Sequence, residues 1–383
     1  MKALLLFSIS LTLISLICPD CIGQYLFSDE DDVWNADFID IFPCLTNDRK
    51  DAFICWDEWS YYDSLKSDLS MDPSKPAITD MIRDHDTGNM IITWDSELNM
   101  TYRIESSTSP YDYDESLMVW TDEVTGLASG GATTLWTDTN VPTVAPAEKY
   151  YRLYAEFAEG DDIKADDTLG LMVFTAYNGR NLISSPFEPY PEGGGTPGES
   201  TLDKIIGSQV TAHFFNPSFS DNIERWDKSI GRYARTWAKS ISGIVVWQNA
   251  FPFKADEGYW YNIVMTHPDR DLILFGRVSP SDRSVDINVS SNSNRNLIGT
   301  CFPKASSLLT CGLLESGFTG HPFNPGFSDQ VEFWDGSAYN RYWFKTGTTN
   351  AWQPSDRVIN PCESFWLIRN MNRPGFTWDY PKP

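Results

Sequence analysis

Hydrophobic and polar residues alternate between residues 77 and 178, and a period of two residues is typical of β-strands with one buried face. Thr101–Ser107 alternates most regularly, and Met90–Trp94 follows the turn signal Asp86–Gly88. Seven strands are expected here: Ile78–Ile82, Met90–Trp94, Thr101–Ser107, Leu117–Thr121, Thr133–Thr137, Tyr150–Phe157 and Leu169–Tyr177. Short strands separated by turn signals in this number predict a β-sandwich over residues 77–178.

The preceding segment, residues 24–76, has a helical pattern instead. Trp34, Phe38 and Phe42 recur at helical spacing, which predicts a helix from Asp32 that ends before Pro43. A second short helix is expected over residues 56–65, followed by a linker. The sequence therefore predicts a short helical segment ahead of the sandwich.

The C-terminal half repeats one pattern, in residues 180–287 and again in residues 295–383. Arg-Asn-Leu-Ile begins each copy, and His-x-Phe-Asn-Pro-x-Phe-Ser-Asp follows at 213–221 and 321–329. The matched tryptophans are Trp226 and Trp334, Trp237 and Trp343, and Trp260 and Trp366. Duplication indicates two tandem copies of one structure, here two small β-rich modules, each with a short helix. The matched tryptophans are expected to be core residues, because two copies of a fold need the same core.

The N-terminus has the features of an export signal. Lys2 precedes an apolar run that is short for a membrane span, and small residues precede Gln24. We expect residues 1–23 to be a signal peptide, with an uncleaved anchor as the alternative. No later stretch has the length and hydrophobicity of a membrane-spanning helix. The mature protein is therefore predicted to be secreted or to lie at the cell surface.

Composition limits the possible partners. The formal net charge is −24, which argues against nucleic acid and anionic membranes, since both attract clustered Lys and Arg. The 15 Trp, 17 Tyr and 22 Phe suit short aromatic strands. An extracellular protein or polysaccharide, of unspecified identity, is the expected partner.

Five cysteines follow residue 23, in two groups. Cys44 and Cys55 are alone in their region and are predicted to form a disulfide, which export permits. Cys301, Cys311 and Cys362 are an odd set, so one is expected to stay free or to pair between molecules.

Residues 47–58 resemble an EF-hand-type calcium loop, as in dockerin-like segments. Asn47, Asp51 and Glu58 stand at the first, fifth and twelfth positions of that loop. Arg49 replaces an oxygen ligand and Ala52 replaces the turn glycine. The alternatives are a weak calcium site and a helix–loop–helix that has lost its metal. No other cofactor is expected.

Residues 77–178 resemble a fibronectin type III domain of the divergent form found in exported bacterial proteins. The resemblance is carried by Ile91–Trp94, Thr101–Glu105, Leu135–Asp138 and Lys149–Leu153. It implies that Trp94 is the core tryptophan of the second strand, and that Tyr150 or Tyr151 is the corner tyrosine. The tandem units resemble tryptophan-rich β repeats at the ends of large secreted and surface bacterial proteins. That resemblance implies architecture and location, not catalysis.

Candidate chemistry is sparse. The sequence has no G-x-S-x-G, H-E-x-x-H or P-loop motif. His213 and His321 are equivalent in the two copies and are expected to make the same structural hydrogen bond. Trp352 and Trp378 appear in one copy alone and are the candidates for exposed, ligand-binding aromatics.

We therefore predict a mostly β, non-enzymatic, exported structural or interaction protein. The alternative is a carbohydrate-binding protein that uses exposed aromatic residues. A third possibility, a hydrolase, would require two converging carboxylates, one of them with a raised pKa.

Overall fold

The computed structural model describes residues 75–110, 119–157, 162–191, 198–207, 209–289, 293–348 and 350–382. The chain divides into two units, Met1–Pro73 and Ser74–Pro383, and all the described residues belong to the second. The predicted signal peptide, the calcium-type loop with Asn47, Asp51 and Glu58, and the Cys44–Cys55 pair lie outside the described residues. Strands dominate the described part of the chain, so the predicted mostly β fold is confirmed. None of its helices has the length and hydropathy needed to span a bilayer.

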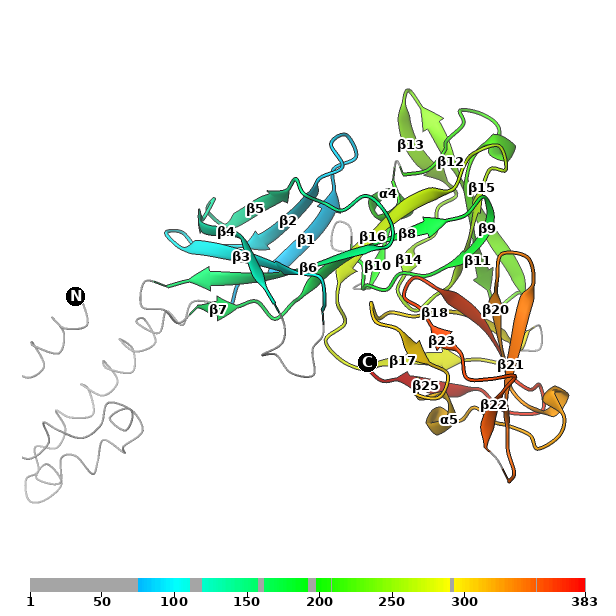
Figure 1. The fold of residues 1–383 in the computed structure, drawn as a ribbon. Coiled ribbons are helices and arrows are strands. Elements are labelled where there is room, and N and C mark those ends of the chain that lie inside the picture. Colours follow the sequence, from blue (N-terminus) through cyan, green and yellow to red (C-terminus); the bar gives the residue numbers. More distant parts are fainter. Residues whose placement is uncertain are drawn as a thin grey trace, which may run out of the picture. The chain divides into compact units, whose positions relative to one another are not determined.

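Two antiparallel sheets form the N-terminal sandwich (Figure 1). The first sheet has the order β1-β2-β5, with β1 (Ile78–Arg83), β2 (Met90–Asp95) and β5 (Thr133–Asp138). The second has the order β8-β6-β3-β4, with β3 (Thr101–Ser107), β4 (Thr121–Ala128), β6 (Ala147–Glu156) and β8 (Leu169–Ala176). A short strand, β7 (Ile163–Lys164), also pairs with β6. The strands are thus divided between two antiparallel sheets, as in a β-sandwich.

Alternating side chains of both sheets form one core. Trp94 of β2 is fully buried, and its ring lies 5.5 Å from the ring of Tyr102 on the facing sheet. Tyr151 of β6 is also buried and donates its hydroxyl to Asp138 Oδ2 at 2.6 Å, which ties β6 to the end of β5. Trp94 is thus a core residue of the second strand, and Tyr151 is a buried residue whose hydroxyl bonds a side-chain carboxylate.

A first repeat begins at β8 and ends at β16, residues 169–277. β16 (Arg270–Arg277) pairs with β8 along its whole length, so β8 belongs both to the sandwich and to the repeat. A five-stranded sheet follows, in the order β13-β12-β11-β15-β9. Its strands are β9 (Gly179–Ile183), β11 (Asn222–Asp227), β12 (Arg232–Ile241), β13 (Ile244–Gln248) and β15 (Tyr259–Ile263). The remaining elements are β10 (Glu199–Ser200), paired with β14 (Phe253–Lys254), α4 (Leu202–Ile205) and the 3-10 helix η4 (Pro217–Phe219).

The second repeat, residues 283–380, has the same elements with the same pairing. β17 (Arg283–Ile287) pairs with β25 (Phe376–Tyr380) as β8 pairs with β16. The five-stranded sheet has the order β18-β24-β20-β21-β22. Its strands are β18 (Arg295–Gly299), β20 (Gln330–Trp334), β21 (Tyr339–Lys345), β22 (Ala351–Gln353) and β24 (Ser364–Ile368). The remaining elements are β19 (Ser306–Ser307), paired with β23 (Val358–Ile359), α5 (Leu313–Ser316) and η5 (Pro325–Phe327).

Strand pairing crosses the unit boundaries expected from the sequence. The sequence separates residues 77–178 from 180–287, but β16 completes the sandwich sheet through β8. It also assigns residues 283–287 to the first unit, whereas β17 pairs with the last strand of the second. One hydrophobic cluster accordingly runs through the sandwich and the first repeat, and another fills the second repeat.

A third apolar cluster, which we call the tryptophan interface, joins the two repeats. It contains Leu182, Trp226 and Trp260 from the first repeat, their equivalents Leu297, Trp334 and Trp366, and Ile368. The aromatic contacts of the interface occur twice, with the repeats exchanged. The rings of Trp226 and Trp366 lie 5.2 Å apart, and those of Trp260 and Trp334 lie 5.3 Å apart. The two repeats are therefore related by a local two-fold axis, as in a dimer of identical subunits.

Equivalent residues face each other close to this axis. A Cβ added to Gly258 would lie 2.7 Å from the Cβ of its equivalent, Ser364. A Cβ added to Gly299 would lie 2.6 Å from the Cβ of its equivalent, Ser184. The Gly258–Ser364 pair has room for one side chain, whereas at Gly299 backbone oxygens exclude a side chain, as Ser184 does, so the two copies differ at these positions.

Candidate functional site: two equivalent aromatic loops

The strongest candidate for a functional site is a pair of loops, residues 213–221 and 321–329, which we call the aromatic loops. Each loop lies immediately before the strand that carries an interface tryptophan, β11 or β20. An Asn-Pro pair begins a 3-10 turn in each loop. The side-chain oxygen of Asn216 accepts from the amide of Ser218 at 2.9 Å, and that of Asn324 accepts from Gly326 at 2.8 Å. Proline suits the first position of such a turn, because its missing N–H has no partner there.

A histidine holds the first half of each loop. His213 Nδ1 accepts from the amides of Phe215 and Asn216, at 3.4 and 3.2 Å. His321 Nδ1 accepts from the equivalent amides, of Phe323 and Asn324, at 3.2 and 3.0 Å. The repeated structural hydrogen bond expected for these histidines is confirmed. An accepting Nδ1 requires the neutral imidazole with its proton on Nε2.

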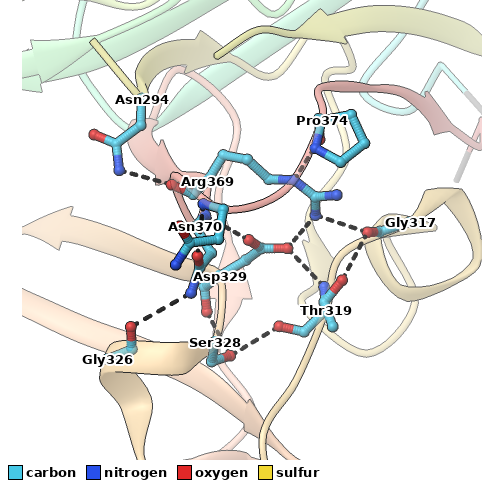
Figure 2. Close-up of polar contacts among 10 residues, drawn as sticks. Asn294, Gly317, Thr319, Gly326, Ser328, Asp329, Arg369, Asn370 and Pro374 are labelled. Atoms are coloured by element: carbon cyan, nitrogen blue, oxygen red, sulfur yellow. Dashed lines mark hydrogen bonds and ion pairs between the residues drawn. The ribbon is translucent and has the colours of Figure 1, made fainter. Parts of the chain in front are cut away.

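A fully buried aspartate fastens the end of each loop. Figure 2 shows Asp329, whose carboxylate accepts from the amides of Thr319 at 2.7 Å and Asn370 at 2.8 Å, and pairs with Arg369. Arg369 is itself buried and also donates to the carbonyls of Gly317 and Pro374, both at 2.9 Å. The loop is thus fixed at its base by charge-assisted hydrogen bonds, which are among the stronger ones in proteins.

Asp221 performs the same task in the first repeat with different partners. Its carboxylate accepts from the amides of Thr211 and Val264, at 2.8 and 3.1 Å, and from the hydroxyl of Tyr261 at 2.9 Å. Nη1 of Arg270 lies 3.0 Å from Oδ2 of Asp221 and forms an ion pair with this carboxylate. Both loops are therefore rigidly built, although they are on the surface.

The loops expose phenylalanine rings. In the first loop Phe214, Phe215 and Phe219 are 62%, 63% and 53% exposed, and in the second Phe323 and Phe327 are 85% and 56% exposed. The rings pack on the loop histidine. The ring centroids of His213 and Phe215 lie 4.7 Å apart, and those of His321 and Phe327 lie 5.3 Å apart. Large apolar side chains gathered on a surface mark interaction sites more often than scattered ones do.

Apart from the buried aspartate at its end, each loop is also uncharged. Residues 213–220 and 321–328 contain no Asp, Glu, Lys or Arg, in a chain whose formal net charge is −24. Each loop is a neutral, apolar feature on an acidic protein.

The tryptophans singled out as ligand-binding candidates are buried. Trp352 is 3% exposed and Trp378 is 0% exposed, so the exposure expected of them is not found. Trp352 also has an equivalent in the first repeat. It pairs with Phe344 as Trp247 pairs with Ala238, at the same place in the sheet. The equivalence is hard to see in the sequence, because β12 has 10 residues whereas its equivalent, β21, has 7, so the spacing to the next tryptophan differs.

Four of the six duplicated tryptophans lie in the tryptophan interface. Trp237 and Trp343 are only partly buried and belong to none of the hydrophobic clusters of the described residues, so the core position expected of this pair is not found. Trp260 and Trp366 are buried in the tryptophan interface, and Trp226 and Trp334 are partly buried there. Each of the latter donates its indole N–H across the interface: Trp226 to the carbonyl of Arg295 at 3.0 Å, and Trp334 to that of Arg180 at 3.1 Å.

The cysteines of the described residues, Cys301, Cys311 and Cys362, are all free and buried. Burial raises the pKa of the Cys301 and Cys311 thiols to about 12 and also raises the pKa of Cys362. A protonated, buried thiol is a poor nucleophile, so these cysteines behave as small apolar residues.

Burial raises the pKa of three glutamates of the described residues, Glu148, Glu257 and Glu363, and a raised pKa often marks a catalytic group. Glu257 and Glu363 are half-buried and equivalent in the repeats. Both lie where the repeats meet, since the backbone of Glu257 bridges to Ile298 and that of Glu363 to Ile183. Each carboxylate also pairs with an arginine. Nε of Arg225 lies 4.0 Å from Oε2 of Glu257, and Nη2 of Arg357 pairs with Oε1 of Glu363. Their equivalent positions and arginine partners indicate a structural role. Within the described ranges no three His, Cys, Asp or Glu residues gather as metal ligands would.

Comparison with known proteins yields no family. No protein-family model matches the chain, and neither does any curated protein. Among solved structures, the chain is similar to Salmonella α2-macroglobulin reacted with methylamine, with 9% sequence identity and a TM-score of 0.17. The match covers 81% of this chain and 23% of that one, and at this TM-score it carries no argument about fold or function.

Proposed function

We propose that this chain is a non-enzymatic, exported structural or interaction protein that acts at or outside the cell surface, and that its aromatic loops contact the partner. The observation that carries the proposal is that one rigid loop, with exposed phenylalanines on it, is built twice. Phe215, Phe219, Phe323 and Phe327 belong to none of the buried core clusters of the described residues, so a folding role does not account for them.

Burial of these rings would supply part of the free energy of binding. Full burial of a phenylalanine side chain contributes about 1.5–3 kcal/mol. Burial of the remaining exposed surface of two or three rings would therefore supply several times RT for each loop. Because hydrogen bonds already fix the loops, little conformational entropy is lost on binding.

Carbohydrate binding is the alternative, and exposed aromatic rings are the observation in its favour. Sugars, however, also require hydrogen bonds to their hydroxyl groups, because a buried, unpaired hydroxyl is costly. In both loops the Asn side-chain oxygen and the His Nδ1 are already engaged within the loop. This leaves the interaction with another protein as the preferred proposal.

The test is retention of the purified protein on immobilised surface proteins of the producing cells. The variant Phe215→Ser with Phe323→Ser should lose retention, because it removes one exposed ring from each loop. Ile244→Ser is the matched control, since Ile244 is 68% exposed but lies on the β12–β13 hairpin. Equal retention of the unsubstituted protein, the double loop variant and the Ile244→Ser control would refute a role of the loops. Retention on cellulose, xylan or chitin that disappears in the loop variant would favour the carbohydrate alternative.

A further inference from the structure

The two aromatic loops are equivalent, which has a consequence for the partner. Resting on the function proposed above, we infer that the protein is bivalent: its two loops bind two copies of the same protein, each inserting its phenylalanines into an apolar pocket. The chain would then act as a bridge between partner molecules.

The partner is a protein because of what the loops can offer chemically. Their polar side chains hold the loop together, through His213 Nδ1 and Asn216 in one copy and through His321 Nδ1 and Asn324 in the other. The large side chains that project into solvent are phenyl rings. A binding site for such a loop must itself be mainly apolar, which is typical of a pocket in a protein interface.

Ring geometry favours a pocket over a flat surface. The rings of Phe214 and Phe215 lie 4.2 Å apart at an interplanar angle of 78°. Two perpendicular rings cannot both lie against one plane, whether it is a sugar ring or a polysaccharide surface. In the first loop, a concave site would accommodate both rings. The second loop has Pro322 in place of Phe214, and there Phe323 projects without a neighbouring phenylalanine at that position.

Charge points to a neutral site on the partner. The absence of charged side chains from residues 213–220 and 321–328 leaves two neutral contact areas on a chain of net charge −24. A partner that recognised this protein by charge would contact acidic surface elsewhere. A pocket for the loops therefore needs no charged residues, and burial of a charge there would be unfavourable.

Bivalency follows from the tryptophan interface. Each loop leads directly into the strand that carries Trp226 or Trp334, and from Asn222 to Trp226 the strand rises about 13 Å at ~3.3 Å per residue. The loops thus lie outside the interface, yet the interface holds them in one fixed arrangement. Two equivalent sites in a fixed arrangement gain avidity towards a partner that is arrayed or oligomeric.

The experiment uses the full-length exported protein with the photo-cross-linking residue p-benzoylphenylalanine in place of Phe215, Phe323 or Ile244. The probe is the surface and culture-medium protein fraction of the producing cells. The 215 and 323 positions should label the same protein, and the 244 position should not. That protein, once purified, should form a complex with two partner copies per chain by native mass spectrometry.

Single-loop variants then separate the two proposals. Phe215→Ser and Phe323→Ser should each reduce the complex to one partner copy, and should weaken binding to a densely coated surface by 10²-fold or more. One partner copy at saturation of the unsubstituted protein, or different proteins labelled at the two positions, would overturn bivalency while loop binding stands. Labelling that is equal at all three positions, or loop-dependent binding to neutral polysaccharides alone, would overturn the protein partner as well. Circular dichroism checks that each variant is folded, which is expected because the substituted rings are exposed.

Discussion

The local two-fold axis between the repeats can be tested by exchanging two side chains. Gly258 and Ser364 are equivalent residues that face each other, and the structure has room for one side chain between them. The perturbation is Gly258→Ser, alone and together with Ser364→Gly. The single substitution should destabilise the protein, and the double substitution should restore much of the loss.

The magnitude follows from the contacts. The added Cβ would lie 2.7 Å from Ser364 Cβ, 2.9 Å from Ser364 Oγ and 2.9 Å from Leu297 Cγ. Forcing extra atoms into a packed site costs about 1–3 kcal/mol. Removal of the Ser364 side chain relieves two of the three contacts, but the second glycine adds an entropic cost of about 0.5–1 kcal/mol. We therefore expect the double variant to be more stable than the sum of the single effects by about 1–2 kcal/mol.

Urea unfolding monitored by tryptophan fluorescence is the assay, because the interface tryptophans report on the contact between the repeats. Gly299→Ala with Ser184→Gly is the matched control. There the added Cβ would lie 2.6 Å from the backbone oxygen of Glu257, which no side-chain change removes, so rescue should fail. If the Gly258 and Ser364 effects add to within about 0.5 kcal/mol, the two residues do not share the space assigned to them.

Three further predictions concern stability and reactivity. Asp329→Ala should destabilise the second repeat by about 3–5 kcal/mol in urea unfolding, because it leaves buried Arg369 without its carboxylate; a loss below 1 kcal/mol would contradict the ion pair. Burial raises the pKa of Glu363 above its ordinary 4.5, so its stabilising contribution is complete below that pH and is lost as the pH rises through the folded-state pKa. Glu363→Gln should therefore become more stable relative to the unsubstituted protein between pH 4.5 and neutrality, and melting temperatures whose difference is constant over that range would refute this. Cys301 and Cys311 should escape iodoacetamide at pH 8 in the native protein and react after denaturation, as peptide mass spectrometry will show; rapid native labelling would mean that the thiols are accessible.

The aromatic loops illustrate what a sequence can reveal about a site. Their duplication is plain in the sequence, and so is the equivalence of His213 and His321, whose shared hydrogen-bonding role the structure confirms. The exposure of Phe215 and Phe323 was not evident, because a phenylalanine in a repeated motif has the same sequence signal whether it fills a core or projects from a loop. Exposure depends on which elements cover the residue, and that is a property of the tertiary structure.

The sequence alone determined the β character of the chain, the sandwich and the presence of two copies of one module. These are properties of local periodicity and of self-similarity, which need no knowledge of distant contacts. The tertiary structure alone decided that β17 pairs with β25, that Trp352 is buried, and that the two repeats meet through Trp226 and Trp366. The physical reason is that the alternation of hydrophobic and polar residues along a strand shows which face is buried, but not which residues bury it. The residues that cover a face can be far away in the sequence, as Trp226 and Trp366 are, and which residues those are depends on how the sheets pack.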